Sequence, residues 1–436
     1  MTLFRFPLKK SVSDRPSVQA VLDVGSSKIC CMVGKLTPHE ERGLLAKRSH
    51  SIDIIGFGLQ RSRGIKCGVV VDMGEAEEAI RLAVDAAERS SGMTIDSLTV
   101  SVSAGRIASE TFQSQIDIDG REVRHGDIRS VLAAGRHHVM EDGRSTLHAM
   151  PIGFSLDAEA NVVDPVGMVG NKLGVDMHVV SADAAPLRNL ELCINRSHLS
   201  VDRFVAAPYA SGLSSLVADE IEMGTACIDI GGGTTTLAIF LHGKLVFADA
   251  IAVGGNHVTM DLARCFSIRL KDAERIKVLH GTTFPSQADE EEILSAASMD
   301  QNNRNPVQMS VAHIGQVIRP RVEETFELIR DRINNSGFAS VLGGRVTLTG
   351  GASQLSGMTE VASSVLGSKV RLGRPLGVAG MKETAKGPAF SAAAGLMIYP
   401  QIKTQEYQQD FRPRNSTAIA SGGAFGRMGR WLRESF

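Results

Sequence analysis

Two stretches of this chain, far apart in the sequence, share one pattern that restricts the folds open to it. Residues 226–240 contain a short apolar run, an Asp, an apolar residue, three glycines, three threonines and a second apolar run. Residues 20–33 follow the same order, with Gly25, Ser26 and Ser27 at the turn. Two apolar runs of strand length around a Gly-rich turn predict a β-hairpin. The chain therefore contains an internal repeat of two hairpins.

The turns of both hairpins carry groups suited to holding a phosphate. Glycine has no Cβ, so backbone N–H groups can approach an anion, and hydroxyl side chains add further donors. An Asp that ends the first strand could hold Mg²⁺ beside a phosphate, usually through water. A glycine-rich hairpin with a capping Asp and no ligand is the alternative for either hairpin alone. The candidate phosphate-binding residues are Gly25, Ser26, Ser27, Lys28, Gly231, Gly232, Gly233, Thr234 and Thr235, and the candidate metal-binding residues are Asp23 and Asp229.

The composition is that of a globular protein with two or more domains. Its 436 residues, 43% of them hydrophobic, supply ample core. A formal net charge of −1 gives no indication of nucleic-acid binding. Six scattered cysteines without a C-x-x-C pair are typical of reduced thiols in a cytosol. No apolar run approaches the ~20 residues of a membrane span, and the basic N-terminus lacks the apolar segment of a signal peptide.

The two hairpins together resemble the phosphate-1 and phosphate-2 loops of the actin, Hsp70 and sugar-kinase superfamily. Residues 346–352, a predicted strand that ends at Gly350 and Gly351, are similar to that superfamily's adenosine loop. After the first hairpin, further strands are predicted at 52–58 and 68–72, then a helix at 75–90 and a strand at 97–103. This β-β-β-α-β order, rather than a strict βαβ alternation, is similar to that of the superfamily's half-molecule. The resemblance implies an α/β, two-lobed, actin-like ATPase fold.

Residues 104–180 interrupt this order with an α+β insertion, which includes a predicted helix at 126–140. Its histidines lack a metal-ligand spacing, so we expect surface or packed side chains. An insertion at this point resembles the 1C (SHS2-type) subdomain of the FtsA family of bacterial cell-division proteins. The supporting phrases are Ser62-Arg63-Gly64-Ile65, His148-Ala149-Met150-Pro151, Pro165-Val166-Gly167-Met168, Asp272-Ala273-Glu274-Arg275-Ile276-Lys277, Ile318-Arg319-Pro320-Arg321 and Trp431-Leu432-Arg433-Glu434-Ser435-Phe436.

The resemblance implies a division of the chain into subdomains. Helices are predicted at 184–196, 311–335 and 389–398, and residues 286–306 are predicted to form a mobile loop. The expected parts are a basic N-terminal arm at 1–17, lobe 1 (1A) at 18–103 and 181–205, the insertion (1C) at 104–180, lobe 2 (2A) at 206–257 and 336–400, subdomain 2B at 258–335, a flexible linker at 401–423 and an amphipathic helix at 424–436. We expect the arm to be disordered, with weak contact to acidic lipids as the alternative.

The resemblance implies that ATP and Mg²⁺ are the ligands, with Glu274 and Lys277 presented to the ribose and adenine. From spacing alone, these two residues would be an ordinary solvated helix face. Attack on a γ-phosphate needs a group that orients the nucleophile. The crossover at 203–213 offers only Ala206 and Ala207 where related proteins have a Glu or Gln. We therefore name no catalytic residue and expect tight nucleotide binding with weak or no ATPase activity. A phosphotransferase or phosphohydrolase, or a scaffold without turnover, are the alternatives.

The last residues form an amphipathic pattern after a polar, Gln- and Ser/Gly-rich linker. Thirteen residues are too few to span a bilayer, so we expect this helix to lie on an anionic membrane surface. A helix docked on the protein's own body is the alternative. At helical spacing one face carries Phe425, Met428, Trp431, Leu432 and Phe436, and the opposite face carries Arg427, Arg430 and Arg433.

The partners follow from the resemblance alone. It implies binding of the FtsZ C-terminal tail through residues 258–335, self-association into filaments, and contact with membrane division proteins through residues 104–180. It also implies a peripheral location on the cytoplasmic side of the inner membrane, at the division septum. No nucleic-acid partner is expected.

Overall fold

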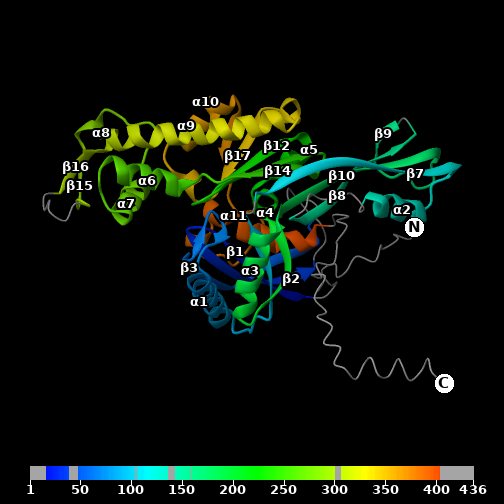
Figure 1. The fold of residues 1–436 in the computed structure, drawn as a ribbon, viewed down its shortest axis with the longest axis horizontal. Coiled ribbons are helices and arrows are strands. Elements are labelled where there is room, and N and C mark those ends of the chain that lie inside the picture. Colours follow the sequence, from blue (N-terminus) through cyan, green and yellow to red (C-terminus); the bar gives the residue numbers. More distant parts are fainter. Residues whose placement is uncertain are drawn as a thin grey trace, which may run out of the picture. The chain divides into compact units, whose positions relative to one another are not determined.

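The computed structural model describes residues 16–38, 48–103, 106–135, 143–157, 159–299 and 306–402. The predicted N-terminal arm through residue 15, most of the predicted linker and the helix predicted at 424–436 lie outside the described residues. Figure 1 follows the chain through two five-stranded sheets and an inserted four-stranded sheet. Among the described residues, no helix combines the length and the apolar composition that crossing a bilayer requires.

Lobe 1 is built on a five-stranded sheet in the order β11-β6-β1-β2-β3. Its strands are β1 (Ser17–Val24), β2 (Lys28–Pro38), β3 (His50–Arg61), β6 (Ser97–Val102) and β11 (Ser200–Ala206). Helix α1 (Met73–Ser91) begins where the Asp72 carboxylate accepts a hydrogen bond from Glu75 N–H, and it ends at Gly92 with φ +69°. Gly58 lets α1 lie directly on β3, since a Cβ there would be 1.8 Å from the Ala83 carbonyl oxygen. Helix α3 (Ala184–Arg196) packs beside α1.

The insertion forms its own antiparallel sheet, in the order β7-β10-β8-β9, with one helix packed on it (Figure 1). Its elements are β7 (Ala108–Glu122), α2 (His125–Gly135), β8 (Arg144–Leu156), β9 (Glu159–Val162) and β10 (Val169–Asp183). The helix predicted at 126–140 is present through Gly135, and residues 136–142 lie outside the described residues.

Lobe 2 repeats the arrangement of lobe 1 with the sheet order β14-β13-β12-β17-β18. Its strands are β12 (Thr225–Ile230), β13 (Thr235–Leu241), β14 (Lys244–Ile251), β17 (Arg345–Thr349) and β18 (Lys369–Leu372). In both sheets a hairpin is followed by a parallel neighbour, β6 beside β1 and β17 beside β12. Helix α10 (Met358–Leu366) contacts β18, and the short α5 (Ala218–Met223) contacts β13.

Subdomain 2B consists mainly of helices. They are α6 (Gly255–Cys265), α7 (Leu270–His280), α8 (Ala288–Glu291) and α9 (Val311–Asn335), with a small hairpin of β15 (Ile293–Ala296) and β16 (Val307–Ser310). The prediction of a loop over 286–306 is wrong for its described part, because α8 and β15 lie within it. Strand β15 pairs with β16, a partner that follows residue 306 and that local polarity does not reveal.

Two helices lie between the sheets of the lobes. Helix α4 (Ala207–Ser215) contacts β12 and β13, whereas α11 (Ser391–Ile398) contacts β1 and β6. The helices cross in close contact, since a Cβ at Gly395 would be 1.7 Å from the Ala210 carbonyl oxygen. Phe390, Leu396 and Tyr399 are part of a core that contains residues of β1 and β2, and the same core includes Cys227, Ala238 and Phe240 of lobe 2.

Candidate functional site

The turns of the two repeated hairpins face each other. A Cβ added at Gly233 would be 2.5 Å from Ser26 Oγ, and one added at Gly232 would be 3.0 Å from Ser27 Cβ. These distances explain why side chains are absent from the second turn. The loop after β3 also reaches the turns, since Ser26 Oγ accepts a hydrogen bond of 3.0 Å from Gly68 N–H. The structure thus brings together two sets of predicted phosphate-binding residues from separate lobes.

The backbone N–H groups at these turns are suited to bind an anion. In each turn the first glycine N–H closes the hairpin, Gly25 to the Lys28 carbonyl and Gly231 to the Thr234 carbonyl. The next N–H groups, those of Ser26 and Ser27 and of Gly232 and Gly233, have no acceptor within the described part of the chain. Gly233 is buried, Ser26 and Gly232 are half-buried and Ser27 is exposed. Free backbone N–H groups that converge at glycine-rich turns form an anion-binding concavity, so the turns fit a phosphate group.

The two candidate metal-binding carboxylates each accept a hydrogen bond from a buried serine. Ser101 Oγ, from β6, donates to Asp23 Oδ1 over 2.6 Å. Ser211 Oγ, from α4, donates to Asp229 Oδ2. Burial, together with repulsion from Asp23, raises the pKa of Asp229 to about 6, although the Ser211 hydrogen bond and Lys28 oppose this rise.

Two carboxylates are enough for magnesium only when other ligands complete its shell. In the described part of the chain, no group of three or more His, Cys, Asp or Glu side chains is arranged to hold a metal ion alone. Magnesium commonly takes one or two carboxylates together with phosphate oxygens and waters. The Asp23 and Asp229 pair fits that pattern, beside turns that fit a phosphate.

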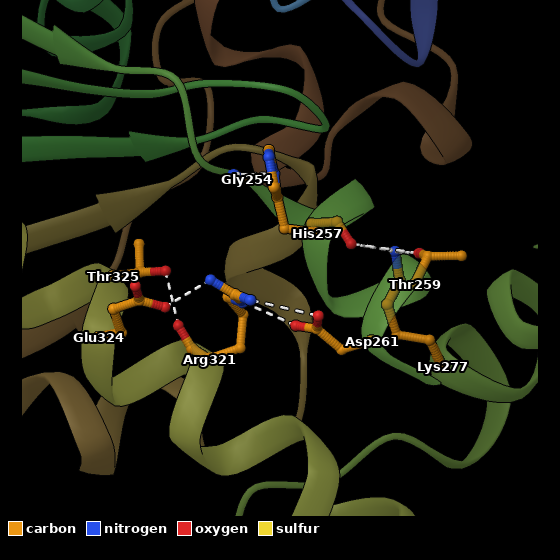
Figure 2. A network of polar contacts seen from close by, with 9 residues as sticks. Gly254, His257, Thr259, Asp261, Lys277, Arg321, Glu324 and Thr325 are labelled. Atoms are coloured by element: carbon orange, nitrogen blue, oxygen red, sulfur yellow. Dashed lines mark hydrogen bonds and ion pairs between the residues drawn. The ribbon is translucent and has the colours of Figure 1, made fainter. Parts of the chain in front are cut away.

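Helix α6 joins the second turn to the residues expected near ribose and adenine. Its first N–H groups bond to the turn, Gly255 to the Gly231 carbonyl over 2.9 Å and Asn256 to the Gly232 carbonyl over 2.7 Å. Lys277 Nζ, from α7, donates to the Gly255 carbonyl, Thr259 Oγ1 and Glu274 Oε2 over 3.0, 2.9 and 2.7 Å. Figure 2 shows Thr259 and Lys277 together, with α6 linked further to α9 by the ion pair of Asp261 and Arg321.

The predicted adenosine loop lies against both of these features. Gly350 has φ +88°, and a Cβ there would be 2.2 Å from Asp229 Oδ1, so only glycine fits this position. Gly351 begins a short 3₁₀ helix, η2 (Gly351–Gln354), whose Ala352 would lie 3.0 Å from a Cβ at Gly255. The loop therefore borders both Asp229 and the start of α6.

Lys28 and Thr235, which were also predicted to bind phosphate, make contacts within the protein. Lys28 Nζ is 5.1 Å from the centre of the Phe390 ring. Thr235 Oγ1 donates to the Val253 carbonyl over 2.8 Å, so its hydroxyl proton serves the fold rather than a ligand. The crossover from β11 into α4 consists of Ala206, Ala207 and Pro208, as the sequence requires, without a carboxylate or amide.

Several polar residues at the site were not predicted as site residues from the sequence. Ser101 and Ser211 hold the two carboxylates, and Thr259 bonds to the Glu274 carboxylate. The Asn256 carboxamide lies 3.3 Å from where a Cβ of Gly232 would be. Only Asn256 had a usable signal, because it follows a pair of glycines at the start of a helix.

The two repeated lobes and their facing turns have the actin-like ATPase fold. Among solved structures, a chain of the PilM-PilN type IV pilus biogenesis complex matches with a TM-score of 0.60, at 16% identity, over 88% of this chain and 98% of its own. MreB 5 of Spiroplasma citri bound to AMPPNP matches with a TM-score of 0.51, at 14% identity, over 89% of this chain and 96% of its own. At these identities the likeness concerns the fold.

Sequence comparison identifies the family within this class. Residues 226–395 match the family model "Cell division protein FtsA", and residues 104–181 match "SHS2 domain inserted in FTSA". Cell division protein FtsA of Rhizobium meliloti is 53% identical over 430 residues, which are 98% of this chain and 97% of the relative. The Pseudomonas aeruginosa protein of the same name is 32% identical over 87% of this chain and 88% of its own. The chain belongs to the FtsA family of cell-division proteins, as the sequence motifs predicted.

Proposed function

We propose that this division protein binds Mg·ATP between its two lobes and polymerises at the inner face of the cytoplasmic membrane. There it anchors FtsZ filaments and helps recruit later division proteins to the septum. The observation that carries the nucleotide part is the contact between the two hairpin turns, which presents unpaired N–H groups from both lobes beside two serine-held carboxylates.

Different residues of the site bind different parts of the nucleotide. The turns at Gly25–Ser27 and Gly231–Gly233, with Lys28, hold the phosphates, and Thr234 borders them. Glu274 and Lys277 meet the ribose and adenine, beside Gly350 and Gly351. Magnesium, held by Asp23 and Asp229, would neutralise phosphate charge.

Turnover in this proposal is slow. The crossover places Ala206 and Ala207 where a water-orienting carboxylate or amide would act. A phosphotransferase or phosphohydrolase of the same fold is the second candidate, and the Asn256 carboxamide beside the second turn is the observation that favours it. A scaffold without turnover shares every binding contact named above.

The partners in this proposal use separate parts of the chain. The FtsZ C-terminal tail docks on subdomain 2B at 258–335, membrane division proteins contact the insertion at 104–180, and copies of the chain associate into filaments. The amphipathic pattern of residues 424–436, with arginines opposite an apolar face, supports attachment to an anionic membrane surface.

The test of the proposed site is the Gly232→Asp variant, with calorimetric titration of ATP in the presence of Mg²⁺. The new carboxylate would lie beside Ser27 and repel phosphate, so ATP binding is expected to be lost. Gly126→Asp is the matched control, because a Cβ at Gly126 meets no atom within 4 Å. Undiminished ATP affinity in Gly232→Asp would remove the second turn from the proposed site.

A further inference from the structure

His148 of the insertion makes a contact that neither the fold of the insertion nor the proposed nucleotide site requires. It lies on β8, its side chain is 2% exposed, and its Nε2 accepts a hydrogen bond of 3.0 Å from the backbone N–H of Ala206. Ala206 is the N-cap residue of α4, and it has no side chain able to cap the helix. The first N–H groups of a helix need acceptors from outside the helix. The insertion supplies one of them to the crossover helix.

This hydrogen bond helps to fix the place of the imidazole ring. A backbone N–H can only donate, so Nε2 is the acceptor in this contact. The ring also packs edge-on against Tyr209 of α4, with 5.2 Å between ring centres, and against Tyr399 after α11, with 5.6 Å. His148 is therefore held at the junction of the insertion, the crossover helix and the end of lobe 1.

Ala206 joins β11, which pairs with the strand of Ser101, to α4, which carries Ser211. In the parallel pairing of β11 with β6, Ala206 is in register with Val102 and Val205 with Ser101. Ser101 bonds to Asp23, and it also accepts a hydrogen bond of 3.2 Å from Val24 N–H. On the other side, Ala206 leads into α4, whose Ser211 bonds to Asp229.

Close packing of α4 prevents the helix from absorbing a displacement of its first residue. A Cβ at Gly212 would be 2.3 Å from the Phe240 ring, and α11 touches α4 at Ala210 through Gly395. A shift at Ala206 is therefore transmitted to Ser211 rather than lost in slack packing.

We infer that His148 is a positioning residue for the nucleotide site: through Ala206 it sets the places of Ser101 and Ser211, and so of Asp23 and Asp229. The insertion and the nucleotide site are then energetically coupled. A partner that moves β8 changes the affinity for Mg·ATP, and by linkage Mg·ATP changes the affinity for that partner by the same factor. This inference rests on the proposed binding of Mg·ATP.

The experiment compares His148→Phe with His148→Gln in the full-length chain. Phenylalanine keeps an aromatic ring against both tyrosines but has no acceptor, whereas the glutamine amide oxygen reaches about as far as Nε2 and accepts. Ser109→Ala is the matched control, since Ser109 Oγ of β7 accepts from Ala248 N–H over 2.9 Å and so joins the insertion to lobe 2, away from Ala206. Calorimetric titration with ATP, in Mg²⁺ and in EDTA, gives affinity and stoichiometry separately.

His148→Phe is expected to weaken Mg·ATP binding by about five- to tenfold, as an unpaired buried N–H at the crossover would. The loss should be confined to the titration with Mg²⁺, because the serines position the carboxylates that hold the metal. Stoichiometry should remain that of the unaltered protein, whereas misfolding would lower it. His148→Gln and Ser109→Ala should bind within about twofold of the unaltered protein.

Each of the other outcomes would contradict either the proposed function or the inference about His148. If the unaltered protein binds no Mg·ATP, the proposed function fails before the inference is tested. If it binds and His148→Phe binds equally well, the inference fails alone. An equal loss of ATP affinity in His148→Phe and His148→Gln would show that the hydrogen-bond acceptor at residue 148 is not what matters. An equal loss in Mg²⁺ and in EDTA would show that the effect does not act through the carboxylates that hold the metal. An equal loss in Ser109→Ala would assign the effect to docking of the insertion in general.

Discussion

Replacing Asp229 by Asn should stabilise the protein without nucleotide while removing its response to Mg·ATP. Burial raises the pKa of the Asp229 carboxyl to about 6, whereas an Asp in an unfolded chain titrates near 3.9. The folded state therefore disfavours the charged form, and folding at neutral pH carries the cost of ionising this group in place. Asparagine has the same shape, needs no charge, and can keep the hydrogen bond with Ser211.

The size of the effect follows from the difference in pKa. A difference of about 2 corresponds to about 3 kcal/mol at 1.36 kcal/mol per pKa unit. Part of Asp229 is accessible to solvent, which reduces the expected gain in unfolding free energy to about 1–2 kcal/mol. For a chain of 436 residues that gain raises Tm by about 1–2 °C.

The difference in Tm between Asp229→Asn and the unaltered protein should depend on pH. Below pH ~4 the carboxyl is protonated in both the folded and the unfolded state, so Asp229→Asn and the unaltered protein should have equal Tm. As pH rises from about 4 to above 6, the unaltered protein loses stability relative to the variant, because only the unaltered protein has this carboxyl to ionise. With Mg·ATP at 100 times its Kd, binding stabilises the unaltered protein by about 2.7 kcal/mol, and the order of the two Tm values reverses.

Thermal unfolding at pH 4 and pH 7, each with and without Mg·ATP, gives the Tm of each protein under all four conditions. Asp331→Asn, at an exposed position of α9, is the matched control and should change Tm little under any of these conditions. A variant that is less stable than the unaltered protein at pH 7 without nucleotide would refute the reasoning. So would a difference in Tm that is the same at pH 4 and pH 7.

Two further predictions concern attachment and turnover. Trp431→Glu places a charge on the apolar face of the amphipathic helix predicted at 424–436, so the variant should fail to sediment with anionic liposomes while its ATP affinity stays unchanged. Co-sedimentation equal to that of the unaltered protein would show that the tail is not the anchor. Phosphate release should be far slower than the ~10 s⁻¹ typical of enzymes, because Ala206 and Ala207 position no water. A rate near that value, measured by a coupled phosphate assay, would point to a catalytic group such as Asn256.

The hairpin turns could be predicted from sequence because their signal is local. An apolar run, an Asp and a glycine turn are contiguous at both sites, and the repeat of this pattern suggested that the turns act together. The insertion and the long helix α9 were also predictable, one from an interruption of order and the other from helical periodicity.

Contacts between residues far apart in the sequence left no local sequence pattern from which they could be predicted. Ser101 and Asp23 are 78 positions apart, and a serine in a strand has the same local pattern whether or not it holds a carboxylate. Strand β15 was missed because its partner β16 lies beyond residue 306. Helix α11 is apolar on all sides, so its sequence does not tell which lobe it enters.

The contact of α11 with β1 has a consequence for how the chain is made. The core that begins with β1 and β2 also needs Phe390, Leu396 and Tyr399, from the far end of the described chain. Ribosomes add about 5–20 residues per second, so roughly 20–80 s separate the synthesis of β1 from that of α11. During that interval lobe 2 can complete its own core, which contains Ile228 and Phe326, whereas the apolar face of β1 that α11 will cover stays open. We therefore expect this apolar face to remain uncovered until synthesis passes residue 399.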